Sequence, residues 1–318
     1  MLDRIVDYLV YNLLPLNPET RLGESVNYFL YDVLKILLLI LLVVFVVSFL
    51  RTYLPPEKIN RIYAKQRFGL GNLMASIFGA VTPFCSCSSI PIFIGFLQAR
   101  VPVGVAFSFI ITSPLVNEVM LIMMGGLFGW RVAVIYALAG ILIGTLAGII
   151  IDKLGLGKGI ILKVKEQESK LLDLSYMPRG LKGKGEYAWA QTKSIFKKLW
   201  WIILIGVGIG AIIHGYIPAE VFTDYLHINS ILAVPIAVLV GIPLYAGCST
   251  MVPVVFAITA KGIPLGTALA FLMSVAGLSA PEAVMLKRVL SWKLLSLFYL
   301  IVAIGIIIVG YVFNLFGL

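Results

Sequence analysis

All three cysteines of the chain lie in two short stretches that also carry hydroxylated side chains and proline. Cys85 and Cys87 lie in TPFCSCSSIP (82–91), and Cys248 lies in PLYAGCST (243–250). Thiolates bind soft species such as Cu(I) or trivalent arsenic, whereas a cysteine that only packs is a small buried hydrophobic side chain. If the two stretches meet in the fold, the three thiols form a site for a thiophilic substrate or metal ion.

The serines and threonine beside these cysteines suit the start of a helix. Their oxygens accept hydrogen bonds from the free N–H groups of a first helical turn, and the positive end of the helix dipole attracts anions. We expect each stretch to begin a helix whose N-terminus faces a substrate; helix capping alone is the alternative. The predicted substrate-binding residues are Cys85, Ser86, Cys87, Ser88, Ser89, Asn117, Cys248, Ser249 and Thr250.

Two glutamates lie in otherwise apolar segments. Glu118 follows TSPLVN and Glu282 follows AGLSAP, and the proline and small residues in both would open a helix beside the carboxylate. Carboxylates inside a membrane are rare and are functional candidates by default, and burial disfavours their charged form. We predict that Glu118 and Glu282 carry a coupling proton. For Glu282, an ion pair with Lys287 or Arg288 near the cytoplasmic end is the alternative.

The composition around these residues is that of an integral membrane protein. The 318 residues are 60 % hydrophobic and 13 % charged, whereas soluble domains are about 25 % charged. Uncharged runs suit helices that cross or nearly cross a hydrocarbon layer of ~30 Å. The net charge of +10 comes from basic residues between these runs, which the positive-inside rule explains without nucleic acid. The main runs are 36–50, 68–97, 132–151, 199–213 and 294–313.

The two halves of the chain carry the same landmarks in the same order and at nearly the same spacing. Four matches in one register indicate a duplication. LPPE (54–57) recurs as IPAE (217–220), CSS (87–89) as CST (248–250), VPVG (101–104) as IPLG (263–266), and NEVML (117–121) as PEAVML (281–286). The expected domains are an interfacial segment at 1–24, transmembrane repeats at 25–151 and 187–318, and a basic cytoplasmic linker at 152–186.

The charges predict that the two repeats are inserted in opposite orientations. Residues 51–67 contain five Lys or Arg, whereas the equivalent residues 216–229 contain none, so the two segments should lie on opposite sides of the membrane. Full spans at 101–127 and 132–151 then leave 71–97 to enter and return as a hairpin with its turn near 82–87. The same argument makes 230–260 a hairpin from the other side.

The predicted fold is therefore an all-α membrane protein with two inverted repeats, each with about three full spans and one re-entrant, broken-helix hairpin. Interrupted helices at corresponding positions of inverted halves mark the substrate site of secondary transporters. Non-helical backbone at membrane depth is buried in protein or lines a cavity. The two cysteine-containing turns are thus the predicted binding site.

TPFCSCSSIP followed by SPLVNEVM resembles the ArsP-type predicted permeases, also called YraQ-like, and GCSTMVPV is similar to the matching motif of the second half. The resemblance covers about residues 25–314. It implies a multi-pass permease of the prokaryotic cell membrane; characterised relatives export trivalent organoarsenicals, and others are associated with efflux of soft metals. The cysteines of the first motif map onto Cys85 and Cys87, while the second turn has Cys248 alone.

We predict a secondary-active permease that couples proton movement to efflux of a trivalent organoarsenical or a soft metal or metalloid. A carrier of a small oxyanion or sulfur-containing anion, held by the opposed helix N-termini, is the alternative. No Walker motif indicates a built-in ATPase, although a separate subunit could supply one, and no residue constellation indicates an enzyme. We expect no cofactor and no nucleic acid. The expected partners are the small-molecule or ion substrate and the lipid bilayer, with a homodimer as one candidate assembly.

Overall fold

The computed structural model describes residues 2–13, 17, 20–51, 69–82, 86–98, 101–155, 160, 180–216, 230–244, 248–260, 262–287 and 289–316, and most of these residues are helical. After α1 (Leu2–Asp7) and the π-helix η1 (Tyr8–Leu13), the first half contains α2 (Arg21–Arg51), α4 (Leu70–Val81), α5 (Ser86–Gln98), α6 (Val103–Leu115), α7 (Glu118–Leu127) and α8 (Trp130–Lys153). The second half contains α10 (Leu181–Tyr216), α12 (Ser230–Gly241), α13 (Cys248–Ala260), α14 (Leu265–Gly277), α15 (Ala280–Leu286) and α16 (Trp292–Phe316).

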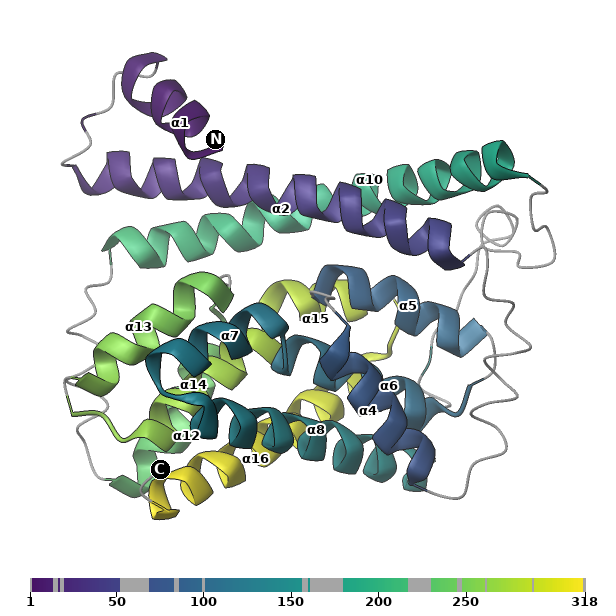
Figure 1. The fold of residues 1–318 in the computed structure, drawn as a ribbon, viewed down its shortest axis with the longest axis vertical. Helices are drawn as coiled ribbons and strands as arrows, with labels where there is room; N and C mark the ends of the chain where they lie inside the picture. Colours follow the sequence, from purple (N-terminus) through teal and green to yellow (C-terminus); the bar gives the residue numbers. More distant parts are fainter. Residues whose placement is uncertain are drawn as a thin grey trace.

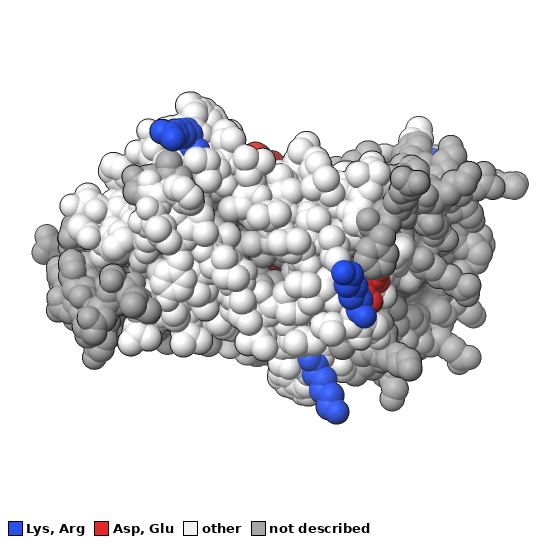
Figure 2. All heavy atoms as spheres, turned by 90° about the horizontal axis from the view of Figure 1, so that it is seen from below, with Lys and Arg blue, Asp and Glu red and all other residues white. Residues whose placement is uncertain are grey.

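The long helices carry apolar side chains on their outer faces. Residues four apart lie on the same side of a helix, and a large exposed apolar face is typical of membrane contact. Figure 2 shows one face of the molecule, on which charged side chains of the described residues are few and scattered. The exposed apolar residues are Val134, Leu138, Leu142, Leu146 and Ile150 on α8, and Leu300, Ile304, Ile308 and Val312 on α16.

Several helical segments are long and apolar enough to cross a membrane. Within the described part of the chain these are α8, α16 and the stretch Leu265–Leu286, and α6 with α7 makes a fourth that is bent by 42°. The predicted all-α membrane protein is confirmed at this level. The span expected over 101–127 is broken rather than straight. Pro114 lies in the last turn of α6, where it cannot donate a backbone hydrogen bond, and the helix ends one residue later.

The same helix pairs pack in both halves. α4, α6 and α8 contact one another, as do α12, α14 and α16. A Cβ added to Gly104 would collide with the carbonyl of Gly148, and one added to Gly266 would collide with the carbonyl of Gly310. Gly266 follows Gly104 at the same distance along the chain as Gly310 follows Gly148. This shared separation, called the repeat offset below, agrees with the duplication predicted from the sequence.

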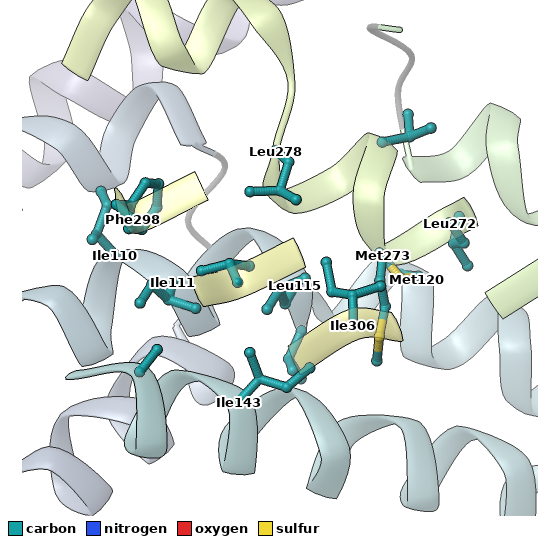
Figure 3. Close-up of a cluster of buried hydrophobic side chains, with 14 of the residues drawn as sticks. Ile110, Ile111, Leu115, Met120, Ile143, Leu272, Met273, Leu278, Phe298 and Ile306 are labelled. Atoms are coloured by element: carbon teal, nitrogen blue, oxygen red, sulfur yellow. The ribbon is translucent and has the colours of Figure 1, made fainter. Parts of the chain in front are cut away.

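Equivalent helices of the two halves run in opposite directions and contact each other. α2 and α10 lie antiparallel on one side of the molecule, and α8 and α16 lie antiparallel on the other (Figure 1). Residues related by the repeat offset also meet: a Cβ on Gly277 would contact Leu115, and one on Gly305 would contact Ile143. Figure 3 shows the resulting shared core, to which both halves contribute buried apolar side chains.

The observed helix boundaries differ slightly from the expected domain boundaries. α10 begins at Leu181, inside the expected linker, and α2 begins at Arg21, inside the expected interfacial segment. The first two helices pack on α2, with Val6 and Val10 fully buried and a hydrogen bond of 2.7 Å from Asn27 to Asp7. Most of the linker lies outside the described residues, so the domain scheme stays a prediction.

Candidate functional site

Each predicted turn separates two apolar helices at equivalent positions. The first lies between α4 and α5, and the second between α12 and α13. The helices that follow the turns, α5 and α13, begin at Ser86 and Cys248, which are separated by the repeat offset. Each has 13 residues and no acidic residue in its first turn. These two helices are called the tip helices below.

Most of the predicted substrate-binding residues belong to the tip helices. Ser86, Cys87 and Ser88 form the first turn of α5, and Cys248, Ser249 and Thr250 form the first turn of α13. Cys85 and the side chains of these six residues lie outside the described part of the structure. Among the residues that are described, no group of three or more His, Cys, Asp or Glu side chains could hold a metal ion. The tentative metal site at Cys85, Cys87 and Cys248 therefore stays a prediction.

Ser89 is the one serine of the first motif whose side chain the structure describes. Its side chain is fully buried, and its Oγ lies 2.6 Å from the Oγ of Ser113. This hydroxyl pair ties α5 to the end of α6, next to the break before α7. The contact gives Ser89 a positioning role, since its hydroxyl already bonds within the protein. Sequence reasoning missed Ser113, whose only signal was its place beside Pro114.

The break between α6 and α7 is closed by a side-chain cap. Asn117 is the N-cap residue of α7, and its side-chain oxygen accepts a hydrogen bond of 2.9 Å from the Val119 N–H. Asn117, a predicted substrate ligand, therefore has a structural role. Glu118 is the first residue of α7 and is partly exposed. Its Oε2 is buried without a hydrogen-bond partner among the described residues.

The equivalent break between α14 and α15 lacks such a cap. Ser279 is the N-cap residue of α15, but its side chain makes no capping hydrogen bond. Ser279 and Glu282 have the spacing of a capping box, in which each side chain bonds the other residue's backbone N–H. The box is not formed: Glu282 is 0 % exposed, and neither carboxylate oxygen has a hydrogen-bond partner in the described part of the chain. A charged carboxylate buried in this way is costly.

The ion pair considered for Glu282 is not seen with Lys287. The Lys287 side chain is exposed, and its Nζ lies over the Trp292 ring, 4.1 Å from the ring centroid. Arg288 lies outside the described residues. Tyr299 of α16 contacts the start of the helix that carries Glu282. The Tyr299 hydroxyl donates a hydrogen bond of 2.9 Å to the Ser279 carbonyl. Sequence reasoning missed Tyr299, because one tyrosine in an apolar span carries no local signal.

The two glutamates occupy different positions relative to the duplication. The N-cap residues Asn117 and Ser279 are separated by the repeat offset, as are the packing glycines. Glu118 and Glu282 are separated by more residues than the repeat offset. Glu118 is the first residue of its helix and Glu282 the third. The position equivalent to Glu282 is Met120, which is fully buried. The sequence match between NEVML and PEAVML therefore does not make the two carboxylates structural equivalents.

Each tip helix contacts the acidic helix of the opposite half. α5 packs against α15, which carries Glu282, and α13 packs against α7, which carries Glu118. Phe128, just after α7, and Phe256 of α13 form an edge-to-face ring pair with centroids 5.3 Å apart. The structure thus brings the helices predicted to bind substrate next to the helices predicted to carry protons, with each pairing made across the two halves.

Apolar helices long enough to cross a membrane, with breaks beside Glu118 and Glu282, fit a multi-pass membrane protein, and the comparisons give its family. A family model described as "Predicted permease" (ArsP_1) matches residues 21–315. This chain therefore belongs to that predicted permease family, and the resemblance inferred from its motifs is confirmed.

Several curated proteins are similar to this chain over most of its length. It is 24 % identical over 266 residues to UPF0718 protein YraQ of Escherichia coli, covering 83 % of this chain and 73 % of that protein. It is 25 % identical over 315 residues to UPF0718 protein MJ0584 of Methanocaldococcus jannaschii, covering 80 % and 86 %. It is 24 % identical over 238 residues to a putative two-component membrane permease complex subunit of Streptococcus mutans, covering 73 % and 74 %. No solved structure matches the chain.

Proposed function

We propose that this permease is a secondary transporter of the prokaryotic cell membrane that exports a thiophilic substrate in exchange for protons. The substrate, a trivalent organoarsenical or a soft metal or metalloid, binds between the first turns of the tip helices. Cys85, Cys87 and Cys248 supply the thiols. Glu282 carries the coupling proton, and Glu118 has a lesser part.

Two inverted repeats with re-entrant hairpins provide the framework for this proposal. The antiparallel course of α2 against α10 and of α8 against α16 supports the inversion (Figure 1). The repeat offset shared by the glycine pairs, the helix caps and the tip helices supports the duplication. The short apolar helices α4 and α12, each followed by a tip helix, are what re-entrant hairpins require.

The buried carboxylate of Glu282 is the single observation on which the proton coupling rests. It is fully buried, it leaves a capping box unformed, and its helix contacts the tip helix α5. An unpaired charge in such a place is unfavourable, so a bound proton stabilises this arrangement. Loss of that proton favours a different arrangement of α15 and α5. Proton binding at Glu282 and substrate binding at α5 then shift the equilibrium between the same two conformations.

The experiment measures accumulation of methylarsonous acid in sealed, everted membrane vesicles with an imposed proton gradient. We compare the wild-type chain with the Cys85→Ser/Cys87→Ser/Cys248→Ser variant at equal levels of inserted protein. Gradient-dependent accumulation that the triple variant loses is the expected result. If the wild type accumulates no more than protein-free vesicles, the proposed substrate class is wrong.

The second candidate is a carrier of a small oxyanion or a sulfur-containing anion. Two 13-residue helices that begin at the turns without an acidic residue in their first turns favour it, because helix N-termini attract anions. The same vesicles distinguish the two functions with sulfite as the probe. Sulfite transport that survives in the triple cysteine variant, together with no transport of the arsenical, supports the anion carrier.

A further inference from the structure

We infer that Tyr299 is a positioning residue that exchanges its hydrogen bond between the Ser279 carbonyl and the Glu282 carboxylate as Glu282 gains and loses its proton. This inference rests on the proposed role of Glu282 as the proton carrier. It names Tyr299 as the group through which protonation of Glu282 changes the conformation of the break between α14 and α15.

The hydrogen bond of Tyr299 lies at the hinge of this broken helix. Its hydroxyl donates to the Ser279 carbonyl at 2.9 Å, and the same carbonyl accepts the first backbone bond of α15, from the Ala283 N–H at 3.1 Å. Tyr299 is thus a second donor to a carbonyl that already has one. Its hydroxyl can leave without orphaning that carbonyl, so the exchange costs little on the side of Ser279.

The other acceptor is close to the first. The Ser279 carbonyl that Tyr299 bonds also accepts the first backbone bond of α15 from Ala283, the residue after Glu282, so Glu282 lies in the same helical turn as this carbonyl. Both carboxylate oxygens of Glu282 are buried and have no hydrogen-bond partner among the described residues. A rotation of the phenol hydroxyl with a small shift of α15 therefore gives an ionised Glu282 a donor.

Other titratable groups near α15 give Glu282 no described partner. α10, which packs on α15, has described titratable side chains that are all exposed or partly exposed: Lys182, Lys184, Glu186, Tyr187, Lys193 and Lys197. On α16, Lys293 is also exposed. The tip helix α5 carries one titratable side chain, Cys87, which lies at the proposed substrate site. On α15 itself, Lys287 lies over Trp292. Tyr299 is thus the described donor best placed to stabilise the ionised carboxylate.

The exchange moves one proton and breaks no covalent bond apart from the carboxyl O–H. With Glu282 neutral, Tyr299 bonds Ser279, which is the arrangement in the structure. When Glu282 releases its proton toward the proposed substrate site, Tyr299 keeps its own proton and donates its hydrogen bond to the carboxylate instead. The Ser279 carbonyl then keeps only its helical bond, and the hinge before α15 can bend. Because α15 contacts α5, this motion reaches the tip helix.

The test is an acid-induced infrared difference spectrum of the purified full-length protein in lipid bilayers. Four proteins are compared: the wild type, Glu282→Gln, Tyr299→Phe and the control Tyr136→Phe, which removes the hydroxyl of a buried tyrosine in the other half. In the wild type we expect a protonated carboxyl band and a shifted tyrosine band. Glu282→Gln should lose both, Tyr299→Phe should lose only the tyrosine shift, and Tyr136→Phe should keep both.

The outcomes separate this inference from the proposed function. If Glu282→Gln loses the carboxyl band but the wild type shows no tyrosine shift, the inference about Tyr299 is wrong and Glu282 remains the proton site. The same holds if the tyrosine shift survives in Tyr299→Phe. A wild-type spectrum without a band assignable to Glu282 overturns both. An unchanged backbone amide band shows that each variant is folded. In transport assays, Tyr299→Phe should move several-fold fewer protons per substrate, whereas Ser279→Ala, which leaves the carbonyl in place, should match the wild type.

Discussion

The break between α6 and α7 and the break between α14 and α15 occupy equivalent positions, but their polar groups are used differently. At the first, Asn117 caps α7, and the hydroxyls of Ser89 and Ser113 bond each other. At the second, the Ser279 side chain makes no capping bond, and the repeat offset places Met251 and Val275 where the first half has its two bonded serines. Glu282 lies there fully buried.

The two breaks share the packing of their helices and differ in how their polar groups are bonded. The duplicated glycine contacts and helix pairs are alike in the two halves, so both breaks are held by the same packing. At the first break, the Asn117 cap and the bonded pair of serines stabilise the local backbone, and Glu118 leaves one buried oxygen without a partner among the described residues. The polar groups at the second break leave a carboxylate without a partner among the described residues, which is costly unless a proton or another ligand compensates it. The two halves therefore share a fold but differ in the chemistry of their breaks.

The largest expected effect comes from neutralising each glutamate in turn. Glu282→Gln should reduce proton-coupled transport to the level of protein-free vesicles, because it removes the group that binds the proton. Glu118→Gln should keep most of the activity, since Glu118 is partly exposed at the start of its helix. Initial rates of proton-driven substrate accumulation measure both. Equal losses in the two variants would contradict the asymmetry of the breaks.

The next effect tests the equivalence of the scaffold. Gly104→Ala and Gly266→Ala each place a Cβ against a backbone carbonyl of the partner helix. Overpacking of this kind costs about 1–3 kcal/mol of unfolding free energy, and both variants should lose a similar amount in detergent unfolding titrations. Gly126→Ala is the control, because a Cβ there has nothing within 4 Å. A loss in one half alone would show that the halves are not packed alike.

A smaller effect distinguishes the two helix caps. Asn117→Ala removes the acceptor for the Val119 N–H, and loss of an N-cap costs about 1 kcal/mol. Ser279→Ala should leave the unfolding free energy nearly unchanged, since the Ser279 side chain makes no capping bond. The same unfolding titration compares the two variants. Equal destabilisation would mean that the second break is capped as well.

The smallest effect concerns the hydroxyl pair. A double-mutant cycle on Ser89→Ala and Ser113→Ala isolates their coupling from the other contacts of each serine. Hydrogen bonds between membrane helices contribute on average about 0.6 kcal/mol, and we expect a coupling of that size. Met251→Ala and Val275→Ala at the equivalent positions provide the matched cycle without a hydrogen bond. A coupling of zero between the serines would mean that their hydrogen bond does not stabilise the first break.

Local features of the fold could be read from the sequence. Uncharged runs predict apolar helices wherever they occur, and the prolines and small residues of TPFCSCSSIP predict an interruption that the structure has between α4 and α5. The proline and small residues of TSPLVN likewise predict an opening of the helix before Glu118, but an apolar run does not reveal that the span over 101–127 bends by 42° there. The register of the glutamates was also misread, since a small difference in offset cannot be resolved by matching short, similar strings.

The sequence by itself determined that this is an all-α membrane protein with apolar helices that are interrupted at polar and proline-containing segments. These properties depend on local composition and on the order of residues along the chain. Only the tertiary structure decided which polar groups have partners: Ser89 with Ser113, Tyr299 with Ser279, and Glu282 with none among the described residues. It also decided that each tip helix contacts the acidic helix of the other half. Such pairings join residues far apart in the chain, and they depend on how whole helices pack rather than on any local pattern.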